Sequence, residues 1–283
     1  MDVLITPEAL GDLLRSDDPP VVLDVRWRLG GPPGEVEYAV GHVPGAVYVS
    51  LDDELAGHGD PTDGRHPLPE PAAFEAAARR WGVRPGRLVV AYDDTGNQAA
   101  ARAWWLLRWA GHEQVRLLDG GLGAWRAAGG ELSTEPATPA PGDLRVRPGA
   151  VPVVGPDELQ PYAGVLLDAR AGERYRGEAE PVDPVAGHIP GAVSLPTVGN
   201  LDAEGRFLPA EVLRERFEAA GVTSGSPVAA YCGSGVTAAH ELAALAIAGF
   251  DGALYPGSWS QWSNLGLPVE VGDGTTDERP GPA

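Results

Sequence analysis

The single cysteine of the chain, Cys232, has the sequence context of a nucleophile. The apolar run 226–231 before it is typical of a buried strand, and the stretch 237–249 after it is typical of a helix. Two glycines in the intervening loop let the backbone curl, so that successive N–H groups can point at one anion. A thiol at this place faces a helix N-terminus, which favours the nucleophilic thiolate. We therefore expect Cys232 to be reactive, although most free cysteines are small buried residues.

The sequence repeats itself, which gives an internal comparison for the cysteine loop. Four segments recur in the same order, and their alignment puts Asp93 in the place of Cys232. We therefore expect two copies of one domain, of which only the second has the nucleophile. The repeated segments are 21–26 with 165–170, 41–46 with 187–192, 89–96 with 228–235, and 118–125 with 255–262. The expected division is a first domain over 1–135, a linker rich in Pro, Ala and Gly over 136–149, a catalytic domain over 150–275 and a loose tail over 276–283.

Short apolar runs alternate with helical patterns in each copy, which predicts an α/β fold. A mostly parallel sheet flanked by helices follows from this alternation, and ligands bind beyond the carboxyl ends of its strands. The predicted strands are 21–25, 87–92, 165–169 and 226–231. The predicted helices are 71–82, 99–111, 210–221 and 237–249, each ending at a glycine.

The composition excludes several functional classes. Hydrophobic residues make up 43% of the chain, as in ordinary folded proteins, and a formal net charge of −19 disfavours nucleic acids and anionic membranes as partners. One cysteine cannot form an internal disulfide, and the six histidines show no zinc-ligand spacing. We therefore expect no metal and no other cofactor. The sequence has neither a basic leader nor a long apolar run, which predicts a cytoplasmic protein.

The motifs of the two copies resemble those of a known enzyme family. Leu-Asp-x-Arg and Gly-His-x-Pro-Gly-Ala occur in both copies, and Cys-Gly-Ser-Gly-Val-Thr-Ala occurs only in the second. Together these motifs resemble the tandem-domain rhodaneses, in particular the 3-mercaptopyruvate sulfurtransferase branch, over nearly the whole chain. The resemblance implies two tandem rhodanese-like α/β domains with the active site in the second.

The resemblance also implies a reaction. In that family the cysteine takes a sulfane sulfur from a small anionic donor and holds it as a persulfide, which implies this role for Cys232. The sulfur then passes to a thioredoxin-like protein, a small thiol or cyanide. We expect 3-mercaptopyruvate as the donor, with thiosulfate as the alternative and a persulfide relay or sensor with little turnover as a further one. The loop residues expected to bind the anions are Gly233, Gly235, Val236 and Thr237.

A cysteine phosphatase is the competing interpretation of such a loop. Its signature requires an arginine six residues after the cysteine, where this chain has Ala238. A phosphate would lack the two N–H donors of that arginine's guanidinium, so phosphoryl transfer is disfavoured.

Arg174 is the expected contact for the anionic group of the donor. The matching arginine of the family's Arg-Tyr-x-Gly motif has that role, and Arg176 is a weaker candidate. A surface arginine paired with Glu173 or Glu178 is the alternative interpretation. The branch has a second arginine in a Glu-Pro-Arg segment, where this chain ends the segment with Val182. This departure keeps thiosulfate open as the donor.

Ser234, His66 and Asp53 are the expected members of a proton relay. Ser234 resembles the small hydroxyl residue of the mercaptopyruvate branch, and His66 resembles the histidine before Leu-Pro in its first domain. Asp53 or Asp52 is the nearest match for the acidic residue of that relay. A turn-forming serine and a surface histidine are the alternative interpretations.

Residues that recur in both copies are expected to have structural roles. The copy without the nucleophile retains them, so they cannot be specific to catalysis, and we expect them to fix loops by hydrogen bonds. They are Asp24, Asp168, His42 and His188. His240 is expected on the surface of the helix after the cysteine loop.

Overall fold

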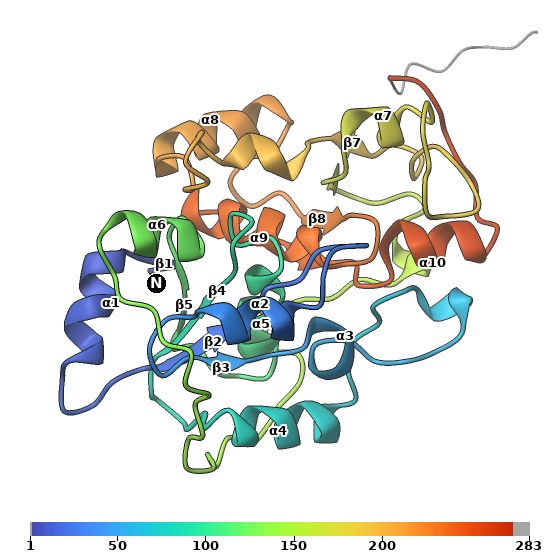
Figure 1. The fold of residues 1–283 in the computed structure, drawn as a ribbon. Helices are drawn as coiled ribbons and strands as arrows, with labels where there is room; N and C mark the ends of the chain where they lie inside the picture. Colours follow the sequence, from blue (N-terminus) through green and yellow to red (C-terminus); the bar gives the residue numbers. More distant parts are fainter. Residues whose placement is uncertain (1, 274–283) are drawn as a thin grey trace, which may run out of the picture.

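The computed structural model describes residues 2–273 and contains two α/β domains in tandem (Figure 1). The first domain, in blue to green, has a five-stranded sheet, and the second, in yellow to red, has a four-stranded sheet. Two α/β domains with parallel sheets flanked by helices are thereby confirmed. The tail expected at 276–283 lies outside the described residues.

The first sheet is parallel, with the strand order β1-β5-β4-β2-β3. Its strands are β1 (Leu4–Ile5), β2 (Val21–Asp24), β3 (Val47–Tyr48), β4 (Val89–Tyr92) and β5 (Val115–Leu118). Its helices are α1 (Pro7–Leu14), α2 (Gly34–Val40), α3 (Leu51–Glu54), η1 (Pro61–Asp63), α4 (Pro71–Arg80), α5 (Ala100–Trp109) and α6 (Gly121–Ala127). Every residue of β2 and β4 is buried, because helices cover both faces of a parallel sheet.

The second sheet is also parallel, with the order β7-β6-β8-β9. Its strands are β6 (Val165–Asp168), β7 (Val193–Ser194), β8 (Val228–Tyr231) and β9 (Ala253–Leu254). Its helices are η2 (Pro156–Glu158), α7 (Gly172–Tyr175), η3 (Thr197–Asn200), α8 (Ala210–Ala219), α9 (Thr237–Ile247) and α10 (Ser258–Asn264). A parallel bridge between Val153 and Leu254 takes the place that β1 has in the first domain.

The duplication is visible in the strand register. Asp24 lies opposite Tyr92 where β2 pairs with β4, and Asp168 lies opposite Tyr231 where β6 pairs with β8. β4 and β8 are interior strands of their sheets, so the loops that follow them emerge at the carboxyl edge, where α/β folds bind ligands. The aligned sequence motifs therefore occupy equivalent places in the two domains.

The residues shared by both copies hold loops in place, as expected from the sequence. Asp24 and Asp168 each pair with the arginine two residues later, at 2.7 and 2.6 Å. His42 and His188 each donate from Nδ1 to a tyrosine carbonyl at 2.8 Å and stack on the ring of the same tyrosine. These contacts occur in both domains, although only the second has a cysteine, so their role is structural.

The segment expected to be a linker, 136–149, has neither helix nor strand and runs along the first domain. The N–H of Gly142 donates to the Arg79 carbonyl at 2.8 Å, and that of Arg147 donates to the Ala110 carbonyl at 2.9 Å. The two domains meet where α5 packs against α9, near the centre of the molecule (Figure 1). No helix within residues 2–273 combines the length and apolar character needed to cross a membrane.

Candidate active site

Cys232 follows β8 directly and is 2% exposed. The backbone N–H of Gly235 donates to its Sγ at 3.1 Å, as expected for a loop that binds an anion. Gly235 has a φ of 79°, and an added Cβ would lie 2.4 Å from the carbonyl oxygen of Pro256. Only glycine fits this turn, which returns the chain past the sulfur before α9 begins at Thr237.

A cavity of about 270 Å³ lies beside the sulfur, and both domains line it. Its volume is at the small end for ligand pockets, which suits a donor of a few heavy atoms. The first domain contributes Trp27, Arg28, Leu29, Arg65, Thr95, Gln98 and Ala99, and the second contributes Arg174, Cys232, Gly233, Ser234, Val236 and Thr237. Of the expected loop residues, Gly235 is the one outside this lining, because it lies behind the sulfur.

Two arginines from different domains meet at Gly233. Arg65 Nη2 is 3.0 Å, and Arg174 Nη1 is 3.3 Å, from the position that a Cβ at Gly233 would occupy. Arg174 pairs with Glu180 at 2.6 Å and with Asp183 at 3.3 Å, and Arg65 pairs with the same Asp183. A Cβ at position 233 would therefore press on both guanidinium groups and shift them slightly.

The partners of Arg174 are not the surface glutamates considered from the sequence. Glu178 pairs instead with Arg176, at 2.7 Å on the surface. Burial opposes ionisation of Glu180, but hydrogen bonds from Arg174 and from the backbone lower the pKa of this carboxyl. Arg174 is thus held by a charged buried partner and faces the cavity.

Ser234, His66 and Asp52 form a series of contacts across the domain interface. His66 Nδ1 is 2.7 Å from Ser234 Oγ, and His66 Nε2 is 3.3 Å from Asp52 Oδ1. Burial, assisted by Arg102 and Arg65 and opposed by Asp52, lowers the pKa of His66 to about 4. The ring is therefore neutral near pH 7, with its proton on Nε2 towards the carboxylate. Nδ1 can then accept the hydroxyl proton of Ser234, as in Ser-His-Asp arrangements that move protons.

The carboxylate beside His66 belongs to Asp52, and Asp53 points elsewhere. Asp53 accepts the hydroxyl of Ser50 at 2.7 Å, where that residue caps α3. Asp52 also accepts from Trp27 Nε1 at 3.1 Å. Consecutive helical residues point about 100° apart, so one of the two aspartates faces His66, and the sequence did not fix which.

The equivalent loop of the first domain is closed by a carboxylate. Asp93 follows β4 as Cys232 follows β8, and it is fully buried. Its Oδ1 accepts the N–H groups of Thr95 and Asn97, and its Oδ2 accepts those of Ala99 and Ala100, at 2.7 to 3.0 Å. The backbones of the two loops differ at Asn97, which has a φ of 67°, whereas the aligned Val236 has a φ of −82°. Burial raises the pKa of Asp93, and the four N–H groups oppose this effect, so the first loop satisfies its donors with its own side chain.

His240 is buried, which corrects the expectation of a surface residue. Its Nδ1 is 2.6 Å from Thr197 Oγ1, and its Nε2 donates to the Gly96 carbonyl of the first domain at 3.1 Å. Burial lowers the pKa of His240 to about 4. The helix face that carries this residue is covered by the other domain, which the pattern of a single helix does not reveal.

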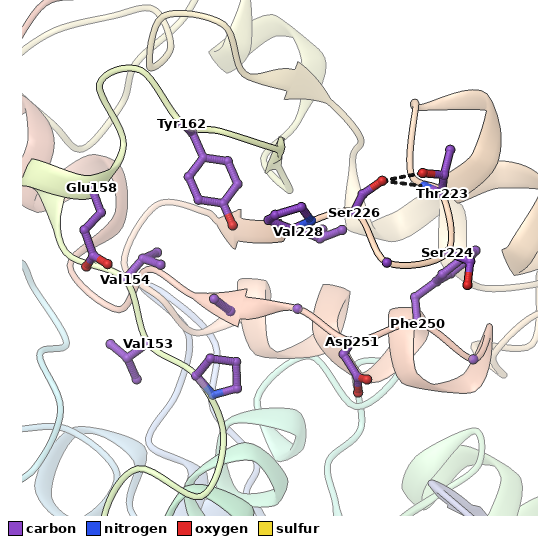
Figure 2. Close-up of a pocket in the computed structure, with 16 residues that line it drawn as sticks. Val153, Val154, Glu158, Tyr162, Thr223, Ser224, Ser226, Val228, Phe250 and Asp251 are labelled. Atoms are coloured by element: carbon purple, nitrogen blue, oxygen red, sulfur yellow. Dashed lines mark hydrogen bonds between the residues drawn. The ribbon is translucent and has the colours of Figure 1, made fainter.

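A larger cavity, of about 700 Å³, lies at the opposite end of the second sheet (Figure 2). Val228 and Ala253, the first residues of β8 and β9, line it, whereas Cys232 follows the other end of β8. Its charged lining residues are Glu158 and Asp251, with no arginine, histidine or cysteine. An anionic sulfur donor would find no positive partner there, so volume alone does not identify the site.

Both domains match one protein family. The family model described as a rhodanese-like domain matches residues 6–128 and 156–265. The chain belongs to the rhodanese family. Rhodanese relatives align with almost all of it, and the domain with the cysteine is the second in the chain.

Three relatives illustrate the range of names within this family. SseB of Mycobacterium tuberculosis, which is named after thiosulfate sulfurtransferase activity, is 47% identical over 93% of this chain and 94% of its own. A Pseudomonas aeruginosa protein named after 3-mercaptopyruvate sulfurtransferase activity is 46% identical over 95% of this chain and 98% of its own. The crystal structure of the Escherichia coli 3-mercaptopyruvate enzyme SseA matches with a TM-score of 0.81 at 30% identity, over 92% of this chain and 99% of that one.

Two arginines of this rhodanese were not predicted as site residues. Arg65 precedes the histidine that sequence reasoning did select, so its position next to His66 was the available signal. Arg102 lies in a helix of the first domain and reaches the cysteine loop across the interface. No sequence signal indicates that contact, because it depends on how the two domains pack.

Proposed function

We propose that this rhodanese is a 3-mercaptopyruvate sulfurtransferase that carries the transferred sulfur as a persulfide on Cys232. One observation carries the proposal: the only cysteine of the chain lies in a glycine-rich loop, accepts the Gly235 N–H at its sulfur, and borders a small cavity lined by arginines from both domains. A thiolate in such a loop can attack a sulfane sulfur without a metal or a separate base. The relatives named after this activity support the assignment.

The first half of the reaction charges the cysteine. The donor carboxylate binds Arg174, and the Cys232 thiolate attacks the donor sulfur. The carbon–sulfur bond breaks, and its electron pair goes to the donor CH2 carbon, giving the enolate of pyruvate. The proton of the donor thiol moves to that carbon through Ser234 and His66, which are 2.7 Å apart. Pyruvate leaves, and the persulfide anion stays in the loop.

The second half of the reaction discharges the persulfide. An acceptor thiolate or cyanide attacks the outer sulfur, and Cys232 leaves as a thiolate, so the kinetics are ping-pong. As part of the proposal, the acceptor is a thioredoxin-like protein or a small thiol and the compartment is the cytoplasm. A lone reduced cysteine suits a reducing compartment.

Arg65 places a guanidinium close to that of Arg174 in the cavity lining, although Val182 replaces the second arginine that the family resemblance implied. Val182 is 40% exposed. The Nε of Arg65 is buried and has no hydrogen-bond partner in the described chain, so this arginine retains an unused donor. We include Arg65 with Arg174 in the binding of the donor anion.

Thiosulfate is the second candidate donor, because Arg65 adds positive charge that the sequence alone did not predict. SseB, which aligns over almost the whole chain, is named after that activity. However, Arg65 and Arg174 share Asp183, and Glu180 compensates Arg174 as well. The two carboxylates offset the charge of the two arginines, and such a site suits a monoanion better than a dianion, so we expect weaker activity with thiosulfate.

Steady-state assays with both donors and one acceptor test this proposal. Release of pyruvate with a higher kcat/KM than for thiosulfate supports it, and a preference for thiosulfate contradicts the choice of donor. Intact-protein mass spectrometry with donor alone should show the gain of one sulfur atom, which a small thiol then removes. A stoichiometric gain without turnover would indicate a persulfide relay or sensor instead of an enzyme.

A further inference from the structure

Arg102 is a buried charge that the proposed mechanism does not use. It lies in the first turn of α5, in the first domain, and is fully buried. Its guanidinium donates to the carbonyl oxygens of Leu55, Gly235 and His66 at 3.2, 3.1 and 3.0 Å. Within residues 2–273 it has no carboxylate partner. Such an arginine is unusual, because a buried charge without an opposite charge is costly.

Cys232 can supply the missing negative charge. Gly235 joins the two groups, since its N–H donates to Cys232 Sγ at 3.1 Å and its carbonyl accepts from Arg102 at 3.1 Å. Burial lowers the pKa of Arg102 to about 10, and a negative charge on Cys232 opposes this effect. The guanidinium therefore remains charged at neutral pH, on the far side of the loop from the cavity.

Other ionisable groups around the loop are already compensated or neutral. Arg65 and Arg174 share Asp183, Arg174 also pairs with Glu180, and Arg28 pairs with Asp94. Arg170 pairs with Asp168, and His66 is neutral because burial lowers its pKa to about 4. The ionisable groups near the loop are Arg28, Arg65, His66, Arg102, Arg170 and Arg174. Among these cations, Arg102 is the one without a carboxylate partner in the described chain.

The repeated domains provide an internal comparison. Gly96 aligns with Gly235, and His240 of α9 donates to the Gly96 carbonyl at 3.1 Å. Each domain thus supplies a donor to the same carbonyl in the loop of the other domain. The donor at the Asp93 loop is a histidine with a pKa of about 4, which is neutral at pH 7. The hydrogen-bond donor at the cysteine loop is the guanidinium of Arg102. The group that stays charged at pH 7 therefore contacts the loop that carries the thiol.

We infer that Arg102 is a positioning residue that supplies, from the domain without a cysteine, the positive charge that keeps Cys232 ionised. The persulfide part of this role rests on the proposed sulfurtransferase function, whereas the effect on the free thiolate does not. The first domain then contributes a buried positive charge to the chemistry of the second, in addition to Arg65 and His66.

The rate of alkylation of Cys232 by iodoacetamide, measured against pH, tests this inference on the full chain. The chain has one cysteine, so the incorporated mass reports this residue alone. Arg102→Gln retains hydrogen-bond donors without the charge, Arg102→Met removes both, and Arg102→Lys retains the charge. Arg108→Gln, on the same helix, is the matched control. The two neutral variants keep the test valid if either one does not fold, which thermal melts decide.

A nearby opposite charge lowers the pKa of an acidic partner by about one unit or more. In a folded neutral variant, the midpoint of the alkylation profile should therefore move about one unit to higher pH, and the rate below the midpoint should fall about tenfold. Arg102→Lys and Arg108→Gln should follow the wild type. A neutral variant with the wild-type profile overturns the inference, and so does an equal shift in Arg102→Lys, which would indicate a role of hydrogen bonds alone. Loss of the proposed function would appear separately, as wild-type protein that alkylates normally but transfers no sulfur.

Discussion

Replacing Arg174 with alanine tests how the donor anion is bound. The substitution removes the guanidinium next to Gly233 and leaves Glu180 and Asp183, whose side chains are 3% and 2% exposed, with fewer cationic partners. Arg170 remains near Glu180 at 3.4 Å, and Arg65 remains with Asp183. The cavity then has one guanidinium fewer, and each of the two carboxylates keeps one arginine partner instead of sharing Arg174.

The size of the effect follows from the lost contact. A hydrogen bond to a charged group contributes about 1.5 to 3 kcal/mol, which corresponds to a loss of about 10- to 150-fold in kcat/KM. The side chain of Arg174 is 18% exposed, so solvent screens this contact only in part. We expect a loss within this range for 3-mercaptopyruvate, because the remaining Arg65 is shared with Asp183.

The assay is pyruvate release at limiting donor with saturating cyanide. Arg176→Ala is the matched control, because this arginine lies two residues away and pairs with Glu178 at the surface. The control should retain kcat/KM within about twofold, and the second half-reaction, sulfur transfer to cyanide, should be unchanged in both variants. Wild-type kcat/KM for both donors in Arg174→Ala, or an equal loss in Arg176→Ala, would refute the role of Arg174.

Three further predictions concern the nucleophile, its loop and pH. Cys232→Ser should fold normally and lose all sulfur transfer, because a hydroxyl forms no persulfide; appreciable turnover would exclude the covalent route. Gly235→Ala should lower both Tm and activity, since its Cβ would lie 2.4 Å from a carbonyl oxygen, and wild-type values would contradict the left-handed turn. The pKa values of His66 and His240 are about 4 in the folded protein and 6.5 in the unfolded chain, so protons bind preferentially to the unfolded state. Tm should therefore fall as the pH is lowered from 6.5 to 5. Glu241, whose pKa burial raises to about 7, offsets this fall in part, and a constant Tm would show that the histidines are not buried as neutral rings.

Local sequence patterns were sufficient to predict the fold and to place the nucleophile at the end of a buried strand. Buried strands read as apolar runs, so 226–231 was predicted close to the observed β8 (Val228–Tyr231). Short elements such as β7 and β9, with two residues each, carry too little periodicity to be recognised. The sequence repeat compensated for these unrecognised short strands, because it aligned the cysteine loop with a second loop that also lies between a strand and a helix.

The contact between Ser234 and His66 was expected from the family resemblance, whereas the other contacts between the domains could not be predicted from the sequence. Arg65 and Arg102 reach the cysteine loop from the first domain, and His240 reaches the first domain from α9. Each contact depends on how the two domains pack against each other, which no local pattern encodes. The choice between Asp52 and Asp53 failed for a smaller reason, since it required the rotation of one short helix.

The carboxylate of Asp93 determines how many anions one chain can take up. It is covalently attached to its loop, so its effective concentration at the four N–H donors far exceeds that of any dissolved anion. Under the proposed function, one chain would therefore take up one donor and store one sulfur, although it has two related loops. Two of those N–H groups, from Ala99 and Ala100, belong to the start of α5. The Asp93 carboxyl group, which occupies the loop of the first domain, thus holds the start of the helix that carries Arg102.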